Sequence, residues 1–428
     1  MHDRRDLLQA HRLMTHRMSQ ALLCGEPDSR NRPLRRMYTA SASSVLVGVI
    51  AASVFGVLGL LLPGRVTGLN QPGTLVVDTD TATVYIPCAG GELCPAMNFA
   101  SALLALDSPG GIRQVAVHQA ALAGYAIGPP VGIPGLPPFL PAASALVRGP
   151  WSVCATGGAT VLVGGVSTRG RPLGPADATL VSAGGGEWLL WDSTRLAIQP
   201  AVAQTLFAAD PVGVPLAWLD SLPRGPDFAA PALPGAGQFV IGPFGTAAPV
   251  GQVYVQQSPR VFYALTADER LAPVTAVTAA LLERVPGAQS AQPISPSMAA
   301  SDLDAAAVQT AGLPATVPRM ARAPSALCAV YRAGPGPTVA VGGSVPPGGG
   351  TSGAVRAWFP PGGGALVRSA QGWFLLADAH RYPVRSAAAA QALGYDLGRD
   401  AVSLPASVTD LLAPGPALDP RAARAPAA

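Results

Sequence analysis

The feature that most constrains this 428-residue chain is a long stretch without charge near its N-terminus. No charged residue occurs from Met37 to Gly64, and Val45–Leu62 forms an apolar core of 18 residues. A helix of about 20 apolar residues crosses a bilayer, and Pro63 with Gly64 ends such a helix. The basic cluster before the core disfavours a buried core helix, and the 44 preceding residues disfavour a cleaved secretory signal. We therefore expect one transmembrane helix at residues 41–63.

The distribution of charge predicts the topology of this helix. All 28 basic residues are arginine; eight of them lie in residues 1–44 beside four acidic residues, whereas the remainder holds twenty of each sign. Arg32, Arg35 and Arg36 flank the span on its N-terminal side, and only Arg65 and Arg113 follow closely on the other. The positive-inside rule then places the N-terminus in the cytoplasm and the C-terminal region outside a plasma membrane that the chain crosses once.

Composition excludes several classes of function. A neutral body offers no electrostatic surface for nucleic acid. A chain without lysine has neither the phosphate-binding GxxxxGK[ST] loop nor Schiff-base chemistry. The 49 glycines and 45 prolines predict many turns and few long helices.

Residues 3–23 have the spacing of an amphipathic helix within a cytoplasmic segment at 1–40. Apolar or neutral side chains recur every three or four positions, with arginines between them; they are Leu7, Leu8, His11, Met14, Met18 and Leu22. Such a helix lies on the anionic inner leaflet, docks on a partner protein, or is only a stop-transfer flank. The sequence leaves these three interpretations open.

The five cysteines divide at the predicted membrane. Cys24 falls on the reducing cytoplasmic side, and the other four fall on the oxidising side. Cys154 and Cys328 each lie in a strand-like run, so a bridge between them would join two distant strands of one domain. Cys88 and Cys94 bracket a short Gly-containing segment and would staple a hairpin.

The region beyond the span contains an internal repeat. Four strand-like runs carry an aromatic residue, followed ten positions later by Pro or Ile and then by an alanine-rich helical stretch. The pairs are Tyr85 with Pro95, Trp188 with Ile198, Tyr263 with Pro273, and Trp373 with Pro383. After the second and fourth copies, Pro215–Pro226 matches Pro405–Pro416. We expect these eight residues to form the core of the repeats.

These patterns predict an α+β protein. The expected repeats span 74–145, 183–234, 258–320 and 370–420, with a C-terminal tail at 421–428. The Val-rich, Gly-punctuated pieces 151–170, 235–257 and 324–369 would assemble one discontinuous central β domain. Because a single repeat cannot bury its apolar face alone, the copies must pack on one another or on this centre.

Several motifs, in this order and after one span, resemble the EccB family of type VII (ESX) secretion proteins of actinobacteria. They are Arg32-Pro-Leu-Arg-Arg36, Pro95-Ala-Met-Asn-Phe-Ala-Ser-Ala102, Gly132-Ile-Pro-Gly135, Trp151-Ser-Val-Cys154, Leu327-Cys-Ala-Val-Tyr331 and Pro360-Pro-Gly-Gly-Gly-Ala-Leu-Val-Arg368. The resemblance covers nearly the whole chain.

The resemblance implies an elongated extracytoplasmic region of four repeats around a central β domain, with a disulfide at the positions of Cys154 and Cys328. It also implies assembly with an EccC-type motor ATPase, with EccD and EccE, with the mycosin protease and with further copies of the chain. The Cys88–Cys94 pair does not come from the resemblance; it is predicted from spacing alone.

No catalytic, metal or cofactor site is expected. His118 and His380 lie outside, far apart in the sequence, without metal-ligand or triad spacing. Asp192, Asp268 and Asp378 occupy turn positions, where aspartate is common for its local hydrogen bonding. The preferred function is therefore a structural subunit. A cell-wall-binding module that uses the repeat aromatics is the first alternative, and a nucleotide hydrolase, a name sometimes attached to the family, is the second.

Overall fold

The computed structural model describes residues 4–24, 33–61, 67–106, 108, 111–137, 139–304, 308, 311–322, 326–332 and 336–427. The chain divides into two compact units. The first consists of Met1–Gly68 with Val117–Gly124, and the second of Leu69–Ala116 with Tyr125–Ala428.

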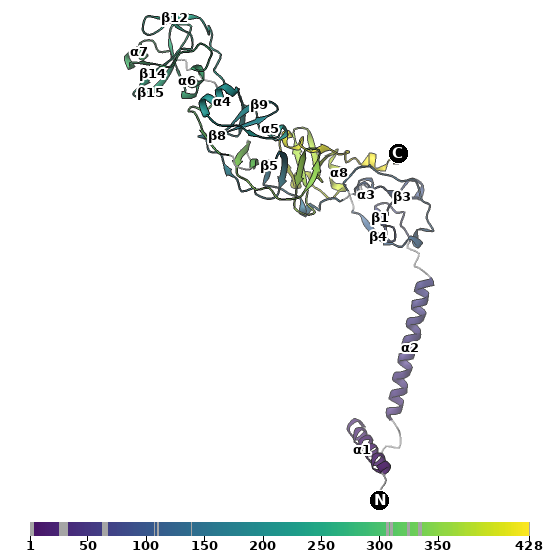
Figure 1. Cartoon of the computed structure of the whole chain (residues 1–428). Helices are drawn as coiled ribbons and strands as arrows, with labels where there is room; N and C mark the ends of the chain where they lie inside the picture. Colours follow the sequence, from purple (N-terminus) through teal and green to yellow (C-terminus); the bar gives the residue numbers. More distant parts are fainter. Residues whose placement is uncertain are drawn as a thin grey trace. The chain divides into compact units, whose positions relative to one another are not determined.

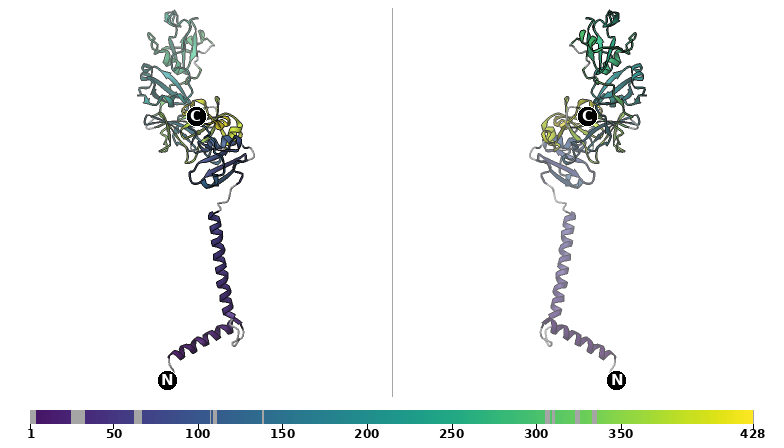
Figure 2. Two further views of the ribbon diagram at one scale, coloured as in Figure 1. Left: turned by 90° about the vertical axis from the view of Figure 1, so that its right-hand side faces the viewer. Right: turned by 90° about the vertical axis from the view of Figure 1, so that its left-hand side faces the viewer.

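The first unit is dominated by two helices, α1 (Arg4–Cys24) and α2 (Pro33–Leu61). Figures 1 and 2 show α2 as one continuous helix. Its segment Thr39–Val57 has a mean hydropathy of 2.0 over 19 residues and none of it is buried, so it is long and apolar enough to cross a membrane. The predicted flanking residues Arg32, Pro63 and Gly64 lie outside the described residues, as do the side chains of Arg35 and Arg36.

The second unit contains four copies of one sheet topology. In each copy three strands form an antiparallel meander, a helix follows, and a fourth strand returns beside the first, which gives the order 3-2-1-4. The first copy is β1 (Thr74–Asp78), β2 (Val84–Pro87), β3 (Leu93–Ala96), α3 (Phe99–Leu106) and β4 (Arg113–Val117); the second is β8 (Asp177–Ala183), β9 (Gly186–Trp191), β10 (Thr194–Ile198), α4 (Pro200–Phe207) and β11 (Val212–Gly213). The third is β14 (Val253–Gln257), β15 (Arg260–Leu265), β16 (Leu271–Val274), α6 (Ala276–Leu282) and β17 (Gln292–Ile294); the fourth is β23 (Ala365–Ser369), β24 (Gly372–Ala377), β25 (His380–Val384), α8 (Ala387–Ala392) and β26 (Ala401–Ser403).

Shorter elements connect and extend these sheets. They are α5 (Leu216–Asp220), α7 (Pro296–Ser301), α9 (Leu397–Asp400), α10 (Ala406–Thr409), α11 (Pro420–Arg424), β12 (Phe239–Ile241), β13 (Ala247–Pro249), β18 (Arg319–Met320), β27 (Ala413–Pro414), and the 3-10 turns η1 (Ala89–Gly91), η2 (Gln119–Leu122) and η3 (Ala143–Ala145). Local sequence explains several boundaries. Thr275 and Ser386 cap α6 and α8 by accepting backbone N–H bonds, and Pro200 occupies the first turn of α4.

Segments far apart in the sequence form a central seven-stranded sheet in the order β21-β22-β6-β5-β19-β20-β7. Its strands are β5 (Trp151–Thr156), β6 (Ala159–Gly164), β7 (Arg171–Pro172), β19 (Ala326–Tyr331), β20 (Pro337–Val341), β21 (Gly350–Ser352) and β22 (Val355–Trp358). Figure 1 shows β5 beside strands drawn in the green of the last third of the chain, and the antiparallel β5–β19 register agrees.

Three predicted boundaries were wrong, because strand composition does not specify a partner. The piece 235–257, expected in the central domain, instead forms the separate β12–β13 sheet and then β14 of the third repeat. Residues 365–369 form β23 of the fourth repeat rather than a central strand. In both cases only two residues separate the strand from the next one, Ser258-Pro259 and Ala370-Gln371, so a hairpin is the partner within reach. The second repeat likewise begins at Asp177, before its expected start at 183.

The hydrophobic cores join these sheets in a definite order. One cluster combines the first and fourth repeats, for example Leu75 with Leu375. A second combines the central sheet with the second and fourth repeats and includes Val153, Trp218 and Leu376. A third combines the second repeat with α6 of the third.

The C-terminal tail is folded, contrary to its assignment as a separate segment. Ala423 of α11 is fully buried in the core shared by the first and fourth repeats. Arg424 donates from Nε to the carbonyl of Ala105 (2.8 Å), and the amide of Ala427 donates to the carbonyl of Pro130 (2.8 Å). The last residues therefore tie the end of the chain to the first repeat.

Candidate functional site

The third strand of each repeat is the position at which the copies are most alike. In three copies a segment after the fourth strand pairs parallel to the outer edge of the third strand, and a glycine amide donates to a third-strand carbonyl. The three bonds run from Gly128 to Leu93 (3.1 Å), from Gly225 to Arg195 (3.0 Å) and from Gly415 to Arg381 (2.8 Å). In the third repeat, Asp304 donates to Leu271 (2.9 Å) at the same place.

The glycines are required by close approach. A Cβ at Gly225 would overlap Leu196, and one at Gly415 would overlap the ring of Tyr382. Gly128 is similar, because its Cβ would lie 2.8 Å from Sγ of Cys94. Since Leu196, Tyr382 and Cys94 are the buried residues next to the bonded carbonyls, the segment packs on the strand with almost no space between them.

The ten-residue pairs do not share one register. Tyr85 faces Pro95 and Tyr263 faces Pro273 directly across their hairpins. Trp188 faces Ala197 rather than Ile198, and Trp373 faces Val384 rather than Pro383.

Turn length explains this difference. Asp192-Ser193 and Asp378-Ala379 are two-residue turns with all four φ angles between 45° and 62°, as in type I′ hairpins. A two-residue turn pairs residues at odd separations, so partners ten apart cannot face each other. The register makes Phe374, not Trp373, the equivalent of Trp188.

Burial of the eight predicted core residues is uneven. Ile198 is 5% and Tyr263 8% exposed, whereas the other six are half-buried. Trp188 and Trp373 pack against the edges of two core clusters. Their rings also contact guanidinium groups of their own repeats: Arg195 and Arg224 lie 5.4 Å and 5.7 Å from the centre of Trp188, and Arg368 lies 5.4 Å from that of Trp373.

The second and fourth repeats each contain an ion pair at the same position. Arg195 binds Asp220, at the end of α5, and Arg381 binds Asp410, directly after α10. The two acids occupy equivalent positions in the matched stretches 215–226 and 405–416. Each pair ties the third strand to the short second helix of its repeat.

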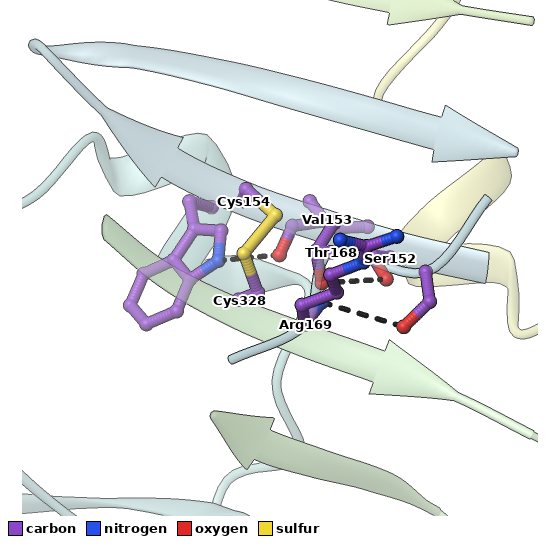
Figure 3. Close-up of a disulfide and its surroundings, with 8 residues drawn as sticks. Ser152, Val153, Cys154, Thr168, Arg169 and Cys328 are labelled. Atoms are coloured by element: carbon purple, nitrogen blue, oxygen red, sulfur yellow. Dashed lines mark hydrogen bonds between the residues drawn. A yellow bond between two sulfur atoms is a disulfide. The ribbon is translucent and has the colours of Figure 1, made fainter. Parts of the chain in front are cut away.

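The central disulfide joins Cys154 and Cys328, which face each other on neighbouring strands β5 and β19 with a Cα–Cα distance of 4.0 Å. Both residues are fully buried. Figure 3 shows the bridge crossing the two strands, with Ser152 and Thr168 in hydrogen-bond contact beside it (3.4 Å). The pairing holds together two strands that are 174 residues apart in the sequence.

The second pair, Cys88 with Cys94, lies in the first repeat with a sulfur–sulfur distance of 2.05 Å. Cys94 belongs to β3 and Cys88 precedes the turn η1, so the pair closes the β2–β3 hairpin. The structure thus places both predicted pairs at disulfide distance.

Buried hydrogen bonds fix the joints between the domains. Trp218 of the second repeat donates from Nε1 to the carbonyl of Val153 (2.8 Å) in the central sheet. Tyr331 of the central sheet donates to the carbonyl of Ser221 (2.6 Å), and Tyr395 of the fourth repeat donates to that of Pro141 (2.7 Å). Burial raises the pKa of Tyr331 to about 12, so its hydroxyl stays protonated as a donor.

One buried carboxylate connects the fourth repeat to the segment before the central sheet. Asp400, only 2% exposed, accepts two bonds from Arg399 and one from the amide of Asp396 (2.9 Å), and pairs with Arg148 (3.1 Å). The hydrogen bonds from Arg399, followed by that from the Asp396 amide, lower the pKa of Asp400 to about 2. No local pattern in the sequence marks this group, because its partner Arg148 is 252 residues away.

Comparison with known proteins identifies the architecture. The family model described as "Type VII secretion system ESX-1, transport TM domain B" matches residues 2–427. The chain belongs to the EccB family. It is 30% identical over 285 residues to the ESX-3 secretion system ATPase EccB3 of Mycolicibacterium smegmatis, an alignment that covers 61% of this chain and 53% of that protein. It is 28% identical over 323 residues to the ESX-5 secretion system ATPase EccB5 of Mycobacterium tuberculosis, which covers 68% and 60% of the two chains.

Solved structures of EccB proteins share the fold. The EccB3 dimer from the ESX-3 core complex matches with a TM-score of 0.64 at 26% identity, covering 82% of this chain and 99% of that one. A chain of an intact ESX-5 inner membrane complex matches with a TM-score of 0.65 at 23% identity, covering all of this chain and 96% of that one. In sequence, the alignments span about half the length of the curated EccB relatives.

The names of these EccB relatives include the word ATPase. Among the described residues, no group of three or more His, Cys, Asp or Glu side chains is arranged to hold a metal ion. His380 contacts the carbonyl of Asp378 (2.7 Å) within its own turn, and His118 precedes η2 in the other unit.

Proposed function

We propose that this chain is a membrane-anchored structural subunit of a type VII secretion complex. The observation that carries the proposal is the match of a type VII secretion transport model to residues 2–427, which include one candidate membrane helix and the four repeats. The buried joints around Val153, Ser221 and Pro141 support a rigid scaffold, since each fixes one domain to another by a bond shielded from water.

The proposed topology places α1 in the cytoplasm and the repeats outside, as the arginines around the span suggest. The proposed partners are an EccC-type motor ATPase, EccD, EccE, the mycosin protease and a second copy of the chain. A dimer is named for the EccB3 relative. Exposed Leu7, Leu8, Met14 and Met18 on α1 support a partner on the cytoplasmic side.

Purification of the complex from the native host tests the assembly role. The full chain with a C-terminal tag is expected to co-purify with an EccC-type ATPase from gently solubilised membranes. A chain lacking residues 2–24 but keeping α2 is the matched control, and it is expected to recover less of the motor. Recovery of the full chain without any EccC-type protein would refute the assignment.

Labelling of Cys24 tests the topology, because the other four cysteines form the two pairs. A membrane-impermeant maleimide is expected to leave this chain unlabelled in intact cells and to react with its Cys24 after the cells are permeabilised. Labelling before permeabilisation, absent in Cys24→Ser, would place the N-terminus outside.

The cell-wall alternative has weaker support. Carbohydrate binding by an aromatic row needs open ring faces, yet Trp188 and Trp373 are half-buried and in contact with arginines of their own repeats. A nucleotide hydrolase has no lysine with which to neutralise phosphates.

A further inference from the structure

A cleft of 530 Å³ opens where the central sheet meets the fourth repeat. Its walls come from the start of β5, the end of β19 and the strand β26. None of the predicted site residues lies in it. The residues that matter for its chemistry are Arg148, Trp151, Arg332 and Ser403.

Trp151 brings an unpaired donor to this cleft. The residue is 3% exposed, and Nε1 has no hydrogen-bond partner among the residues that the structure describes. A Cβ at Gly164 would lie 2.8 Å from Cζ3, so the six-membered ring is packed against the sheet. A Cβ at Gly149, which also lines the cleft, would lie 4.0 Å from Nε1, so the five-membered ring lies beside this part of the cleft wall. A buried donor without an acceptor costs about 1–3 kcal/mol, which an acceptor in the cleft would recover.

The cleft is also positively charged. Arg148 and Arg332 line it, and none of the other described lining residues is acidic. The carboxylate of Asp400 is shared between Arg148 and Arg399, and the carboxylate of Asp396 also lies near Arg399. Arg332 is exposed and has no ion pair among the described residues. Three arginines, Arg148, Arg332 and Arg399, therefore face two carboxylates, Asp400 and Asp396.

The third wall is a sheet edge that no other strand of the described residues covers. β26 is the outermost strand of its sheet and runs parallel to β23. The amide of Leu404, just after β26, donates to Arg368 of β23 (3.0 Å). Because successive residues of an extended strand direct their backbone groups to opposite sides, Ser403 directs its N–H and C=O away from β23, into the cleft.

We propose that this cleft binds the C-terminal end of another polypeptide in extended conformation. The peptide adds a strand to the edge of β26, and its terminal carboxylate accepts bonds from Nε1 of Trp151 and from Arg148 and Arg332. A carboxylate suits these donors because it only accepts hydrogen bonds and is negatively charged. The edge strand favours a peptide over a free anion or a sugar.

Fluorescence anisotropy tests this with the full chain in detergent and a dye-labelled Ala-Val-Ala-Ala peptide. The peptide with a free C-terminus is expected to bind, and its C-terminal amide to bind about tenfold more weakly, the equivalent of about 1.4 kcal/mol. Arg332→Gln is expected to weaken the free acid by a similar factor. Trp151→Phe removes the N–H and is expected to weaken it several-fold. Arg385→Gln, an exposed arginine of the same repeat outside the cleft, serves as the control and is expected to bind unchanged.

Three results would overturn the proposal. The first is equal binding of acid and amide. The second is full displacement of the peptide by acetate or inorganic phosphate at equal concentration, which would leave only an anion site. The third is unchanged affinity in Arg332→Gln, the variant on an exposed side chain whose folding is least at risk.

Discussion

The second and fourth repeats are built alike, and the first and third differ from them at one place. In the second and fourth repeats, the third-strand residue that accepts the glycine amide bond is an arginine, and it binds an aspartate at the short second helix. The next residue along the strand is buried; it is Leu196 in the second repeat and Tyr382 in the fourth. In the first repeat these two positions are Leu93 and Cys94, and in the third repeat the arginine position is Leu271. The backbone bond to the third strand is therefore the constant part of the fold. In the described part of the chain, the ion pair between the third strand and the short helix occurs only in the second and fourth of these four copies.

In the first repeat, the buried position of Leu196 and Tyr382 is occupied by Cys94, which forms a disulfide with Cys88. This local bridge can be compared with the central bridge between Cys154 and Cys328. In the chain-entropy model, stabilisation grows with the loop that the bridge closes. Replacing Cys154 and Cys328 together by Ala is expected to lower the free energy of unfolding by about 5 kcal/mol, and replacing Cys88 and Cys94 by about 2 kcal/mol. Thermal unfolding of the full chain in detergent measures both. Equal losses would show that Cys94 does more than close a local hairpin.

Replacing the glycine whose amide donates to the third strand is expected to cause the next largest loss of stability. Gly415→Val and Gly225→Val place a side chain where Tyr382 or Leu196 already lies, and each is expected to cost about 1–3 kcal/mol. Gly124→Ala, with no atom within 4 Å of the added Cβ, is the control and is expected to unfold at nearly the same temperature. A tolerated Gly415→Val would mean that the parallel segment is not held against the third strand.

The buried carboxylate of Asp400 distinguishes the fourth repeat from the second. Asp400→Asn removes the charge that faces Arg399 and Arg148, and is expected to cost about 1–3 kcal/mol at pH 7. Because the folded pKa of Asp400, about 2, lies below its ordinary value of 3.8, the stabilisation is full above pH 4 and is lost as the pH falls toward 2. Unfolding measured from pH 7 to pH 2 is expected to show a shallower acid decline in Asp400→Asn than in the wild type. Parallel curves would contradict this.

Local patterns predicted much of the fold. The candidate membrane helix follows from apolar length, and the Cys88–Cys94 pair follows from spacing. The Cys154–Cys328 pair was expected from two strand-like runs and from the family resemblance. The aspartates of the two-residue turns were assigned correctly as turn residues. The partner of a strand could not be read in this way, which is why 235–257 was misplaced. The burial of α11 and the pairing of Arg148 with Asp400 connect residues hundreds of positions apart, and no local pattern encodes them.

The ion pairs shared by the second and fourth repeats are expected to have the smallest effect, despite being the clearest match between the copies. Asp220 is 54% and Asp410 42% exposed, so water competes for both carboxylates. Asp220→Asn and Asp410→Asn are each expected to lower stability by less than about 1 kcal/mol, with the loss shrinking further at 1 M salt. Double-mutant cycles with Arg195→Gln and Arg381→Gln measure the coupling within each pair. A coupling well above 1 kcal/mol in one repeat only would show that the two copies, although alike in geometry, use the pair differently, since Asp410 also accepts a bond from Gln371 (3.1 Å).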